Sequence, residues 1–268
     1  AAPASAADGG LTPKRLRCEY LEDPLGIDVQ KPRLSWALEA QQRNSGQSAY
    51  QVLVASERSL LDPPSADMWN TGKVESSDQV NVPYEGKQLK SGQTYYWRVR
   101  AWDDDGVVGP WSNVATFQMG LLEENDWKGT WIAAPDADVS APLLRTEFSA
   151  DKRIKSAHAY ICGLGYYELY INGSKVGDHV LDPGTTEYDK RVLYETYDVT
   201  GHMKSGGNAV GVMLGNGYFH HGSKAWYEKE RAIYAEKPQL LMQVNVTFED
   251  GSTAIIATDE SWKVSDGP

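Results

Sequence analysis

The chain has 268 residues and a formal charge of −11, because 37 Asp and Glu outnumber 26 Lys and Arg. This balance argues against nucleic-acid and anionic-membrane partners, since both require a positively charged face. Hydrophobic residues make up 41% of the chain, which is enough for the packed cores of about two domains. No apolar run approaches the roughly 18 residues of a membrane-spanning helix.

Residues 1–10 are rich in Ala and contain no long apolar run, so we expect a disordered N-terminal tail. The two cysteines, Cys18 and Cys162, lie far apart and exclude a disulfide-stapled miniprotein or a cysteine-rich zinc site. Tyr and Trp number 15 and 9, against 4 Phe. Because Tyr and Trp combine an apolar ring with a polar group, this bias suits half-buried strands or surfaces that stack on ligands.

Short apolar runs between Gly and Pro turns, with almost no 3.6-residue period, predict an all-β chain. Residues 11–120 contain runs with alternating apolar residues, the clearest spanning 95–101. Their spacing predicts a sandwich of about seven strands. Tyr95 follows an apolar residue and a Gly turn, as in a tyrosine corner. Together with Trp36, these features predict a fibronectin type III-like domain over residues 11–120.

Residues 121–131 are short and polar, but they include Trp127 and Trp131. Because the two indole rings would bury against a neighbouring domain, we expect a packed linker rather than a mobile one.

Residues 132–268 predict a second antiparallel sandwich, a jelly roll. Asn172-Gly173 is a strong hairpin signal between two apolar patterns. Alternating residues near 210–214 and 240–248 predict two further strands. The sequence ends at Ser265-Asp266-Gly267-Pro268, a turn with no strand after it, and we expect that the polypeptide originally continued.

Motifs of nucleophilic, phosphate-binding and zinc-protease chemistry are absent from the sequence. The glycine run 211–217 is expected to permit a close backbone approach or a bulge. Asp103-Asp104-Asp105-Gly106 is read as a solvated turn rather than a calcium loop. His220 and His221 cannot easily share a metal ion, because adjacent side chains on a strand point to opposite faces. They are therefore interpreted as ordinary loop residues.

Glycoside hydrolysis needs two carboxyl groups roughly 5 to 9.5 Å apart. Sequence spacing does not place any two of the candidates across a cleft, and surface or turn positions are favoured for them. The candidates in the second block are Glu168, Asp178, Asp182, Glu187, Asp189 and Glu195.

Aromatic and acidic residues gather in two predicted loops of the second block. Flat rings can pack under the C–H faces of a sugar, while carboxylates and amides accept its hydroxyl protons or bind calcium. The equally weighted alternative is that the rings only cap the ends of the sandwich. The carbohydrate-binding candidates are Asp178, Asp182, Glu187, Tyr188, Asn216, Tyr218 and Trp226.

Several motifs, in order, resemble bacterial α-L-rhamnosidases of glycoside hydrolase family 78, and the resemblance covers nearly the whole chain. Its densest part lies in the second block. The motifs are Leu16-Arg17-Cys18-Glu19-Tyr20, Asp23-Pro24-Leu25-Gly26-Ile27-Asp28, Pro32-Arg33-Leu34-Ser35-Trp36, Tyr95-Tyr96-Trp97-Arg98-Val99, Gly109-Pro110-Trp111-Ser112, residues 165–173, Val176-Gly177-Asp178, Thr196-Tyr197-Asp198-Val199-Thr200 and Leu214-Gly215-Asn216-Gly217-Tyr218.

The resemblance implies that a fibronectin-like and a jelly-roll domain precede an (α/α)6 barrel, which carries the catalytic glutamates of an inverting mechanism. This chain would then lack the catalytic residues and the barrel that is its partner. In some relatives the jelly roll takes terminal L-rhamnose through calcium. By loop position, the corresponding calcium ligands here would be Asp178, Asp182, Asn216 and Glu228.

The sequence therefore predicts the N-terminal accessory part of a secreted or periplasmic α-L-rhamnosidase that acts on rhamnose-containing glycans. Three alternatives stay open: a stand-alone L-rhamnose-binding module, spacer domains of another secreted glycosidase, and an adhesion ectodomain. The last alternative leaves the motifs of the second block unexplained.

Overall fold

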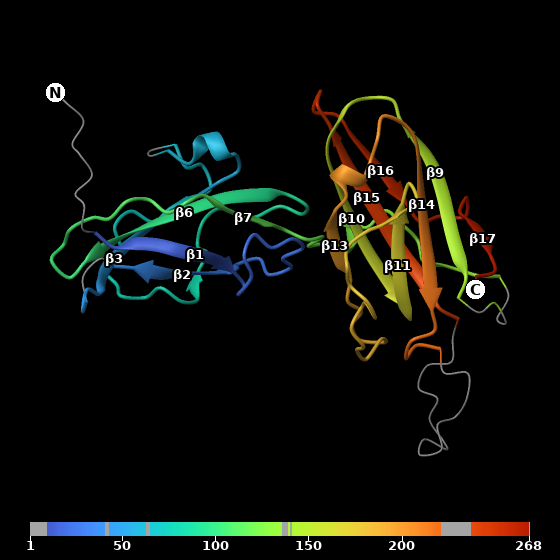
Figure 1. Ribbon diagram of the computed structural model, residues 1–268, viewed down its shortest axis with the longest axis horizontal. Helices are drawn as coiled ribbons and strands as arrows, with labels where there is room; N and C mark the ends of the chain where they lie inside the picture. Colours follow the sequence, from blue (N-terminus) through green and yellow to red (C-terminus); the bar gives the residue numbers. More distant parts are fainter. Residues whose placement is uncertain are drawn as a thin grey trace, which may run out of the picture. The chain divides into compact units, whose positions relative to one another are not determined.

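The computed structural model describes residues 10–40, 43–62, 65–135, 139, 141–220 and 237–267. The chain divides into two compact units, Ala1–Asp126 and Trp127–Pro268 (Figure 1). Residues 1–9 of the predicted tail lie outside the described residues. Gly10 is buried, and a Cβ built on it would lie 2.7 Å from the Cα of Gly109. The described part of the chain contains no helix long and apolar enough to cross a membrane.

The described part of the first unit forms a sandwich of two antiparallel sheets with three and four strands, as the sequence predicts. This strand order is that of an immunoglobulin-like or fibronectin-like domain. Two short 3-10 helices accompany it, η1 (Arg58–Leu60) and η2 (Glu124–Asp126). The sheets are, in order, β1 (Thr12–Cys18), β2 (Arg33–Glu39) and β5 (Val82–Pro83), and then β4 (Trp69–Asn70), β3 (Gln47–Ala55), β6 (Thr94–Asp103) and β7 (Ala115–Gln118).

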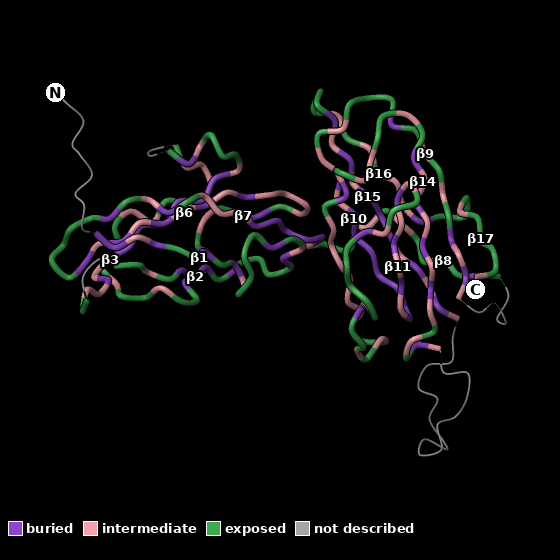
Figure 2. The backbone as a smooth tube through the Cα atoms, in the orientation of Figure 1, coloured by how far each residue is buried: buried purple, intermediate pink, exposed green. Residues whose placement is uncertain are grey.

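The core of the first unit follows the predicted alternation in β6 and departs from it in β3 (Figure 2). In β6, every second residue from Tyr95 to Asp103 is buried, which confirms the prediction of one core-facing side. In β3, Leu53 and Ala55 are also buried, on the opposite face, where they form a second small cluster with Leu61. The polypeptide after β3 covers that face, so β3 is buried on both sides.

The tyrosine corner expected at Tyr95 is present. The Tyr95 hydroxyl accepts a hydrogen bond from the Lys90 backbone N–H at 2.9 Å and donates to Gln93 Oε1 at 3.1 Å. Burial raises the pKa of Tyr95, so the phenol keeps its proton in the core. This bond anchors the turn before β6 to the strand that the turn leads into.

Part of the aromatic excess lies on the outer face of this unit. Arg100 stacks over both Trp102 and Trp111, at 4.9 and 4.7 Å from the ring centroids. Arg98 also lies over the Trp111 ring, 4.7 Å from its centroid. Such cation–π contacts give half-exposed indole rings a structural role without any ligand.

The described part of the second unit consists of two five-stranded antiparallel sheets, the sandwich predicted for residues 132–268. A short 3-10 helix, η3 (Thr200–His202), follows β13. The first sheet contains β13 (Glu195–Asp198), β10 (Ile154–Leu164), β15 (Gln239–Phe248) and β16 (Thr253–Ala257), with β8 (Ile132–Ala133) also paired to β15; the second contains β12 (Ser174–Lys175), β11 (Tyr166–Ile171), β14 (Gly206–Gly215), β9 (Leu143–Ala150) and β17 (Lys263–Ser265).

The hairpin between β11 and β12 has the turn that Asn172-Gly173 predicts. Both residues have a left-handed backbone, with φ of 53° and 83°, which is the requirement of a type I′ turn. The Asn172 side chain also accepts from the Ala209 N–H at 3.0 Å and donates to the His202 carbonyl at 2.9 Å. The turn is therefore tied to β14 as well as to its own strands.

The segment 121–131 is divided between the units. Ser91 Oγ bonds the Asp126 carboxylate and accepts from the Leu122 N–H at 3.0 Å, so the first half packs on the first unit. Trp127 contacts Tyr194 edge to face, with 5.3 Å between ring centroids, in the second unit. Trp131, in contrast, keeps 38% of its surface exposed.

The cysteines are buried thiols, Cys18 in the first unit and Cys162 in the second. Burial raises the pKa of each thiol to about 12. A thiol that stays protonated is a poor nucleophile and a poor metal ligand, so both residues serve packing.

Replacing Tyr95 with Phe tests the tyrosine corner. The change removes the acceptor of the partly buried Lys90 N–H bond, and we expect the first unit to lose about 1–3 kcal/mol of unfolding free energy. Urea titration with hydrogen exchange of the β6 amides measures that unit by itself. Tyr96→Phe is the matched control, because the Tyr96 hydroxyl makes no hydrogen bond within the described residues. Equal losses in both variants would contradict the assignment.

Candidate functional site

The sugar-binding candidates that the structure describes lie on two loops that meet one corner of the second sandwich. The corner is the turn from β10 into β11 at Gly165. The Tyr167 N–H donates to the Asp182 carbonyl at 3.0 Å, which attaches the loop between β12 and β13. A Cβ on Gly217 would lie 3.1 Å from the Gly165 backbone, which places the loop after β14 against the same turn. The expected close approach of glycines is confirmed there.

The polar candidates have different surroundings. Asp178 and Asn216 are exposed. Glu187 is also exposed and pairs with Lys190, with 2.8 Å between the carboxylate oxygen and Nζ. Asp182 is half-buried, with its side chain 22% exposed, and faces its own loop. These residues thus lie on the same corner, but their side chains do not all face one common site.

The aromatic candidates divide between capping and exposure. Tyr188 packs edge to face on Phe219, with 5.3 Å between ring centroids, and Phe219 is only 5% exposed. These two rings close the end of the sandwich, as the capping alternative expects. Tyr218, in contrast, is 59% exposed, so much of its side chain lies at the surface.

The remaining candidates, Trp226 and Glu228, lie outside the described residues. Across the ranges that the structure describes, His, Cys, Asp and Glu side chains form no group of three or more that could hold a metal ion. The calcium set Asp178, Asp182, Asn216 and Glu228 therefore stays a prediction.

Asp182 is the centre of a hydrogen-bond network that the sequence did not predict. Its Oδ2 lies 2.7 Å from His179 Nδ1, and its carboxylate also bonds the Tyr197 hydroxyl. The Tyr197 hydroxyl lies 3.1 Å from that of Tyr167, which is buried. Gly177 has a φ of 70°, and a Cβ there would lie 2.8 Å from the Tyr197 ring. The glycine thus lets the loop pass over Tyr197.

Glu195 lies beside this network, and its protonation is coupled to it. Burial raises the pKa of Glu195, the negative charge of Asp182 raises it further, and His179 opposes the shift. Two carboxyl groups in unequal environments are typical of acid–base pairs. Here, however, the Asp182 oxygens are bonded to His179 and Tyr197, so the pair is tied to the fold rather than presented to a substrate.

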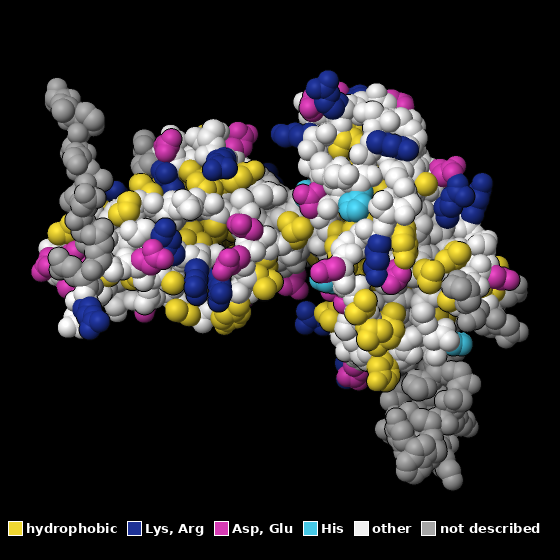
Figure 3. Space-filling model, in the orientation of Figure 1, with side chains coloured by type: hydrophobic (Ala, Val, Ile, Leu, Met, Phe, Trp, Pro, Cys, Tyr) yellow, Lys and Arg dark blue, Asp and Glu magenta, His cyan; other side chains and the backbone are white. Residues whose placement is uncertain are grey.

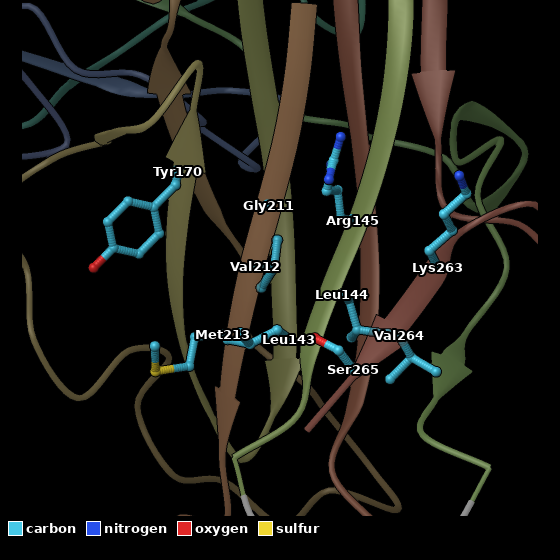
Figure 4. Close-up of a pocket in the computed structure, with 10 residues that line it drawn as sticks. All are labelled: Leu143, Leu144, Arg145, Tyr170, Gly211, Val212, Met213, Lys263, Val264 and Ser265. Carbon is cyan, nitrogen blue, oxygen red and sulfur yellow. The ribbon is translucent and has the colours of Figure 1, made fainter. Parts of the chain in front are cut away.

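A hollow of about 440 Å³ lies on the outer face of the sheet that contains β14 (Figure 4). Tyr170 stands on one side, Gly211 and Met213 lie in the middle, and Arg145 and Lys263 stand on the other side. No sequence motif predicts this hollow. The one available signal was Gly211, which was read as a close backbone approach; instead, no other atom lies within 4 Å of a Cβ built there.

Hydrophobic side chains also reach the surface of the second unit, between mixed positive and negative charges (Figure 3). Val180 and Leu181, on the loop that carries Asp182, are 68% and 67% exposed. Exposed neighbouring apolar residues often mark a contact surface for another polypeptide.

The fold defines a two-domain, all-β protein in which each unit is an antiparallel β-sandwich. Two family models match it: "Rha78A-like, N-terminal immunoglobulin domain" over residues 13–123 and "Alpha-L-rhamnosidase N-terminal domain" over residues 152–268. The chain thus consists of N-terminal domains of the α-L-rhamnosidase family, consistent with the resemblance to glycoside hydrolase family 78.

Individual relatives agree with the family models. An α-L-rhamnosidase of Formosa agariphila is 38% identical over an alignment of 273 positions, which covers 92% of this chain and 29% of the relative. The α-L-rhamnosidase structure from Dictyoglumus thermophilum is 44% identical with a TM-score of 0.86, and covers 96% of this chain and 30% of that one. The Aspergillus terreus enzyme is 38% identical with a TM-score of 0.84, over 96% and 30%. The chain therefore spans less than a third of these relatives.

Glu195 predicts a pH dependence of stability. A folded-state pKa above the ordinary value of 4.5 means that ionised Glu195 destabilises the fold, and this cost appears as the pH rises above 4.5. We expect Glu195→Gln to raise the free energy of unfolding of the second unit more at pH 7 than at pH 4. Urea titration at both pH values measures it.

The matched control for this experiment is Glu187→Gln, an exposed position in the same loop region. Its effect should stay within about 0.5 kcal/mol at both pH values. An equal effect of Glu195→Gln at the two pH values, or a loss of stability at pH 7, would contradict the assigned burial of the carboxyl group.

Proposed function

We propose that this chain is the N-terminal accessory part of an α-L-rhamnosidase, an enzyme that hydrolyses terminal non-reducing α-L-rhamnose from glycans or glycosides. The observation that carries the proposal is that N-terminal domain models of one enzyme family match both units. Hydrolysis itself is assigned to an (α/α)6 barrel with catalytic glutamates, the partner that the family resemblance implies.

The carboxylates of the second unit support an accessory role. Glu187 is paired with Lys190, and Glu168 with Lys175 at 2.7 Å. Asp182 is bonded within its loop, and Glu195 is half-buried beside it. Hydrolysis requires two carboxyl groups facing one glycosidic bond, and none of these residues is arranged in that way.

The proposed work of the parent enzyme is the degradation of rhamnose-containing polysaccharides outside the cytoplasm. Polysaccharides are too large to cross a membrane unaided, so an enzyme that trims them is secreted or periplasmic. Cell fractionation of a bacterium that produces the protein tests this location, and a purely cytoplasmic signal would contradict it.

A second candidate function is a carbohydrate-binding module for L-rhamnose, and the exposed Tyr218 favours it. The ring stands on a loop two residues from Asn216, which is also exposed, and Asp178 is exposed on the other loop of the corner. An aromatic ring with amide and carboxylate groups nearby is the composition of sugar sites. The spacer alternative is favoured instead by the exposed Val180 and Leu181, which suit a polypeptide contact.

Purified protein should release no rhamnose from an aryl α-L-rhamnoside above the rate of a protein-free blank. The physical reason is that Asp182, Glu187 and Glu168 are each engaged in hydrogen bonds or ion pairs of the fold. Chromogenic assay over several hours measures this, with the full-length Formosa agariphila α-L-rhamnosidase as positive control. Hydrolysis that persists through repurification would overturn the accessory assignment.

Calorimetry with L-rhamnose decides between the binding and spacer roles. A binding module predicts saturable heat at millimolar sugar, reduced at least about fivefold in affinity by Tyr218→Ala because the stacking ring is lost. Tyr188→Phe is the control, since that ring packs inside the sandwich end. Repeating the titration with a chelator tests the calcium prediction. Absence of heat in both conditions leaves only the spacer role.

A further inference from the structure

The hollow on the outer face of the second unit is built from one row of residues that crosses the sheet. Strand pairing places Tyr170 opposite Gly211, Gly211 opposite Arg145, and Arg145 opposite Lys263. Side chains directly opposite on neighbouring strands stand on the same face. An aromatic ring, a gap and two cations therefore follow one another across four strands (Figure 4).

The missing side chain of Gly211 creates the gap, although the backbone conformation at this position does not require glycine. No other atom lies within 4 Å of a Cβ at this position, and its φ is outside the left-handed region. Any larger side chain would fit the strand and fill the hollow. On the next row, Met213 lies opposite Leu143, which gives the floor an apolar edge. The volume of about 440 Å³ falls within the range of small-molecule sites, roughly 300–1,000 Å³.

Hydrogen bonds that involve neighbouring side chains on β11 and β12 hold the Tyr170 ring in place. Its hydroxyl donates to Glu168 Oε2 at 2.7 Å, and Lys175 Nζ donates to Glu168 Oε1 at 2.7 Å. These two bonds lower the pKa of Glu168, so the carboxylate stays ionised and the network persists at neutral pH. A positioned aromatic wall binds a sugar at little cost in conformational entropy.

The opposite wall carries two positive charges, and among the described residues only that of Arg145 has an ion-pair partner. Like charges directly opposite on neighbouring strands destabilise a sheet, yet Arg145 and Lys263 occupy such a pair. Glu147 is ion-paired to Arg145, but both side chains are more than half exposed, so this bond is weak and exchangeable. Lys263 has no ion pair within the described residues. In a chain of charge −11, this local surplus indicates an anionic ligand.

We propose that this hollow binds one sugar unit that carries an anionic group, a carboxylate or a sulfate. The pyranose ring lies over Gly211 between Tyr170 and the Met213 edge, and the anionic group lies between Arg145 and Lys263. The hollow by itself indicates a small anion with an apolar body. That this anion is a sugar rests on the proposed function. The site is separate from the corner loops that carry Tyr218.

Two glycine substitutions form a matched pair for the test. Gly211→Leu fills the hollow. Gly207→Leu makes the same change on the same strand and the same face, away from the hollow, where a Cβ also meets no atom within 4 Å. Arg145→Gln and Lys263→Gln remove the charges singly. Amide spectra of each variant verify that the fold is kept, since none of the four positions is in the core.

The measurement is an NMR titration of the labelled protein with four probes: methyl β-D-glucuronoside, glucose 6-sulfate, methyl β-D-glucoside and inorganic sulfate. We expect saturable shifts at residues 143–145 and 211–213 with an anionic sugar, with Kd of about 1 mM. Gly211→Leu should abolish these shifts, Gly207→Leu should leave them unchanged, and each charge variant should weaken binding about tenfold. The first two probes distinguish carboxylate from sulfate.

Three results would overturn the proposal: no saturable shift with either anionic sugar at 20 mM, equal affinity for the neutral glucoside, or equal affinity for inorganic sulfate. Equal affinity for the neutral glucoside would show that Arg145 and Lys263 do not contribute to binding. Equal affinity for inorganic sulfate would show that the pyranose ring does not contribute. The outcome is independent of the rhamnoside assay. A chain that fails here can still be an accessory part of a rhamnosidase, and a chain that binds here can fail there.

Discussion

Every strand of the second sandwich is subject to one constraint: successive side chains point to opposite faces of the sheet. In β14, the burial of Val210, Val212 and Leu214 in the core leaves Gly211 and Met213 on the outer face. Antiparallel pairing then sets Tyr170 and Arg145 on either side of Gly211. The hollow is thus a direct consequence of core packing, because a register shift of one residue would turn all these side chains inward.

The corner loops obey a different constraint, the need to satisfy polar groups in a partly buried turn. Asp182 accepts bonds from side chains of its own loop and of β13, while its carbonyl accepts from the first residues of β11. Two glycines, Gly165 and Gly217, permit the close approach of the two loops. Asp182 and Glu187 therefore serve the loop structure, and among the described aromatic candidates Tyr218 is the exposed one. The domain with this corner matches the N-terminal domain model of the rhamnosidase family over residues 152–268.

Much of the fold was predictable because its signals are local. The alternation in 95–101, the Asn172-Gly173 turn and the tyrosine corner each involve residues close in sequence, and the structure confirms all three. The burial of β3 on both faces was not predictable, since it depends on the later segment around Leu61. The pairing of Asp182 with His179 and Tyr197 was missed for the same reason: Tyr197 joins it from another strand.

The sequence by itself determined the all-β class, the two sandwiches and the relation to α-L-rhamnosidases, because strand periodicity, turn residues and ordered motifs are properties of the linear chain. Only the tertiary structure decided which polar residues face each other. Arg145 and Lys263 are 118 positions apart, and Tyr170 and Gly211 are 41 apart; these distances close only through strand register. Register depends on the packing of whole sheets, so a site built across strands becomes visible only when the sheets have formed.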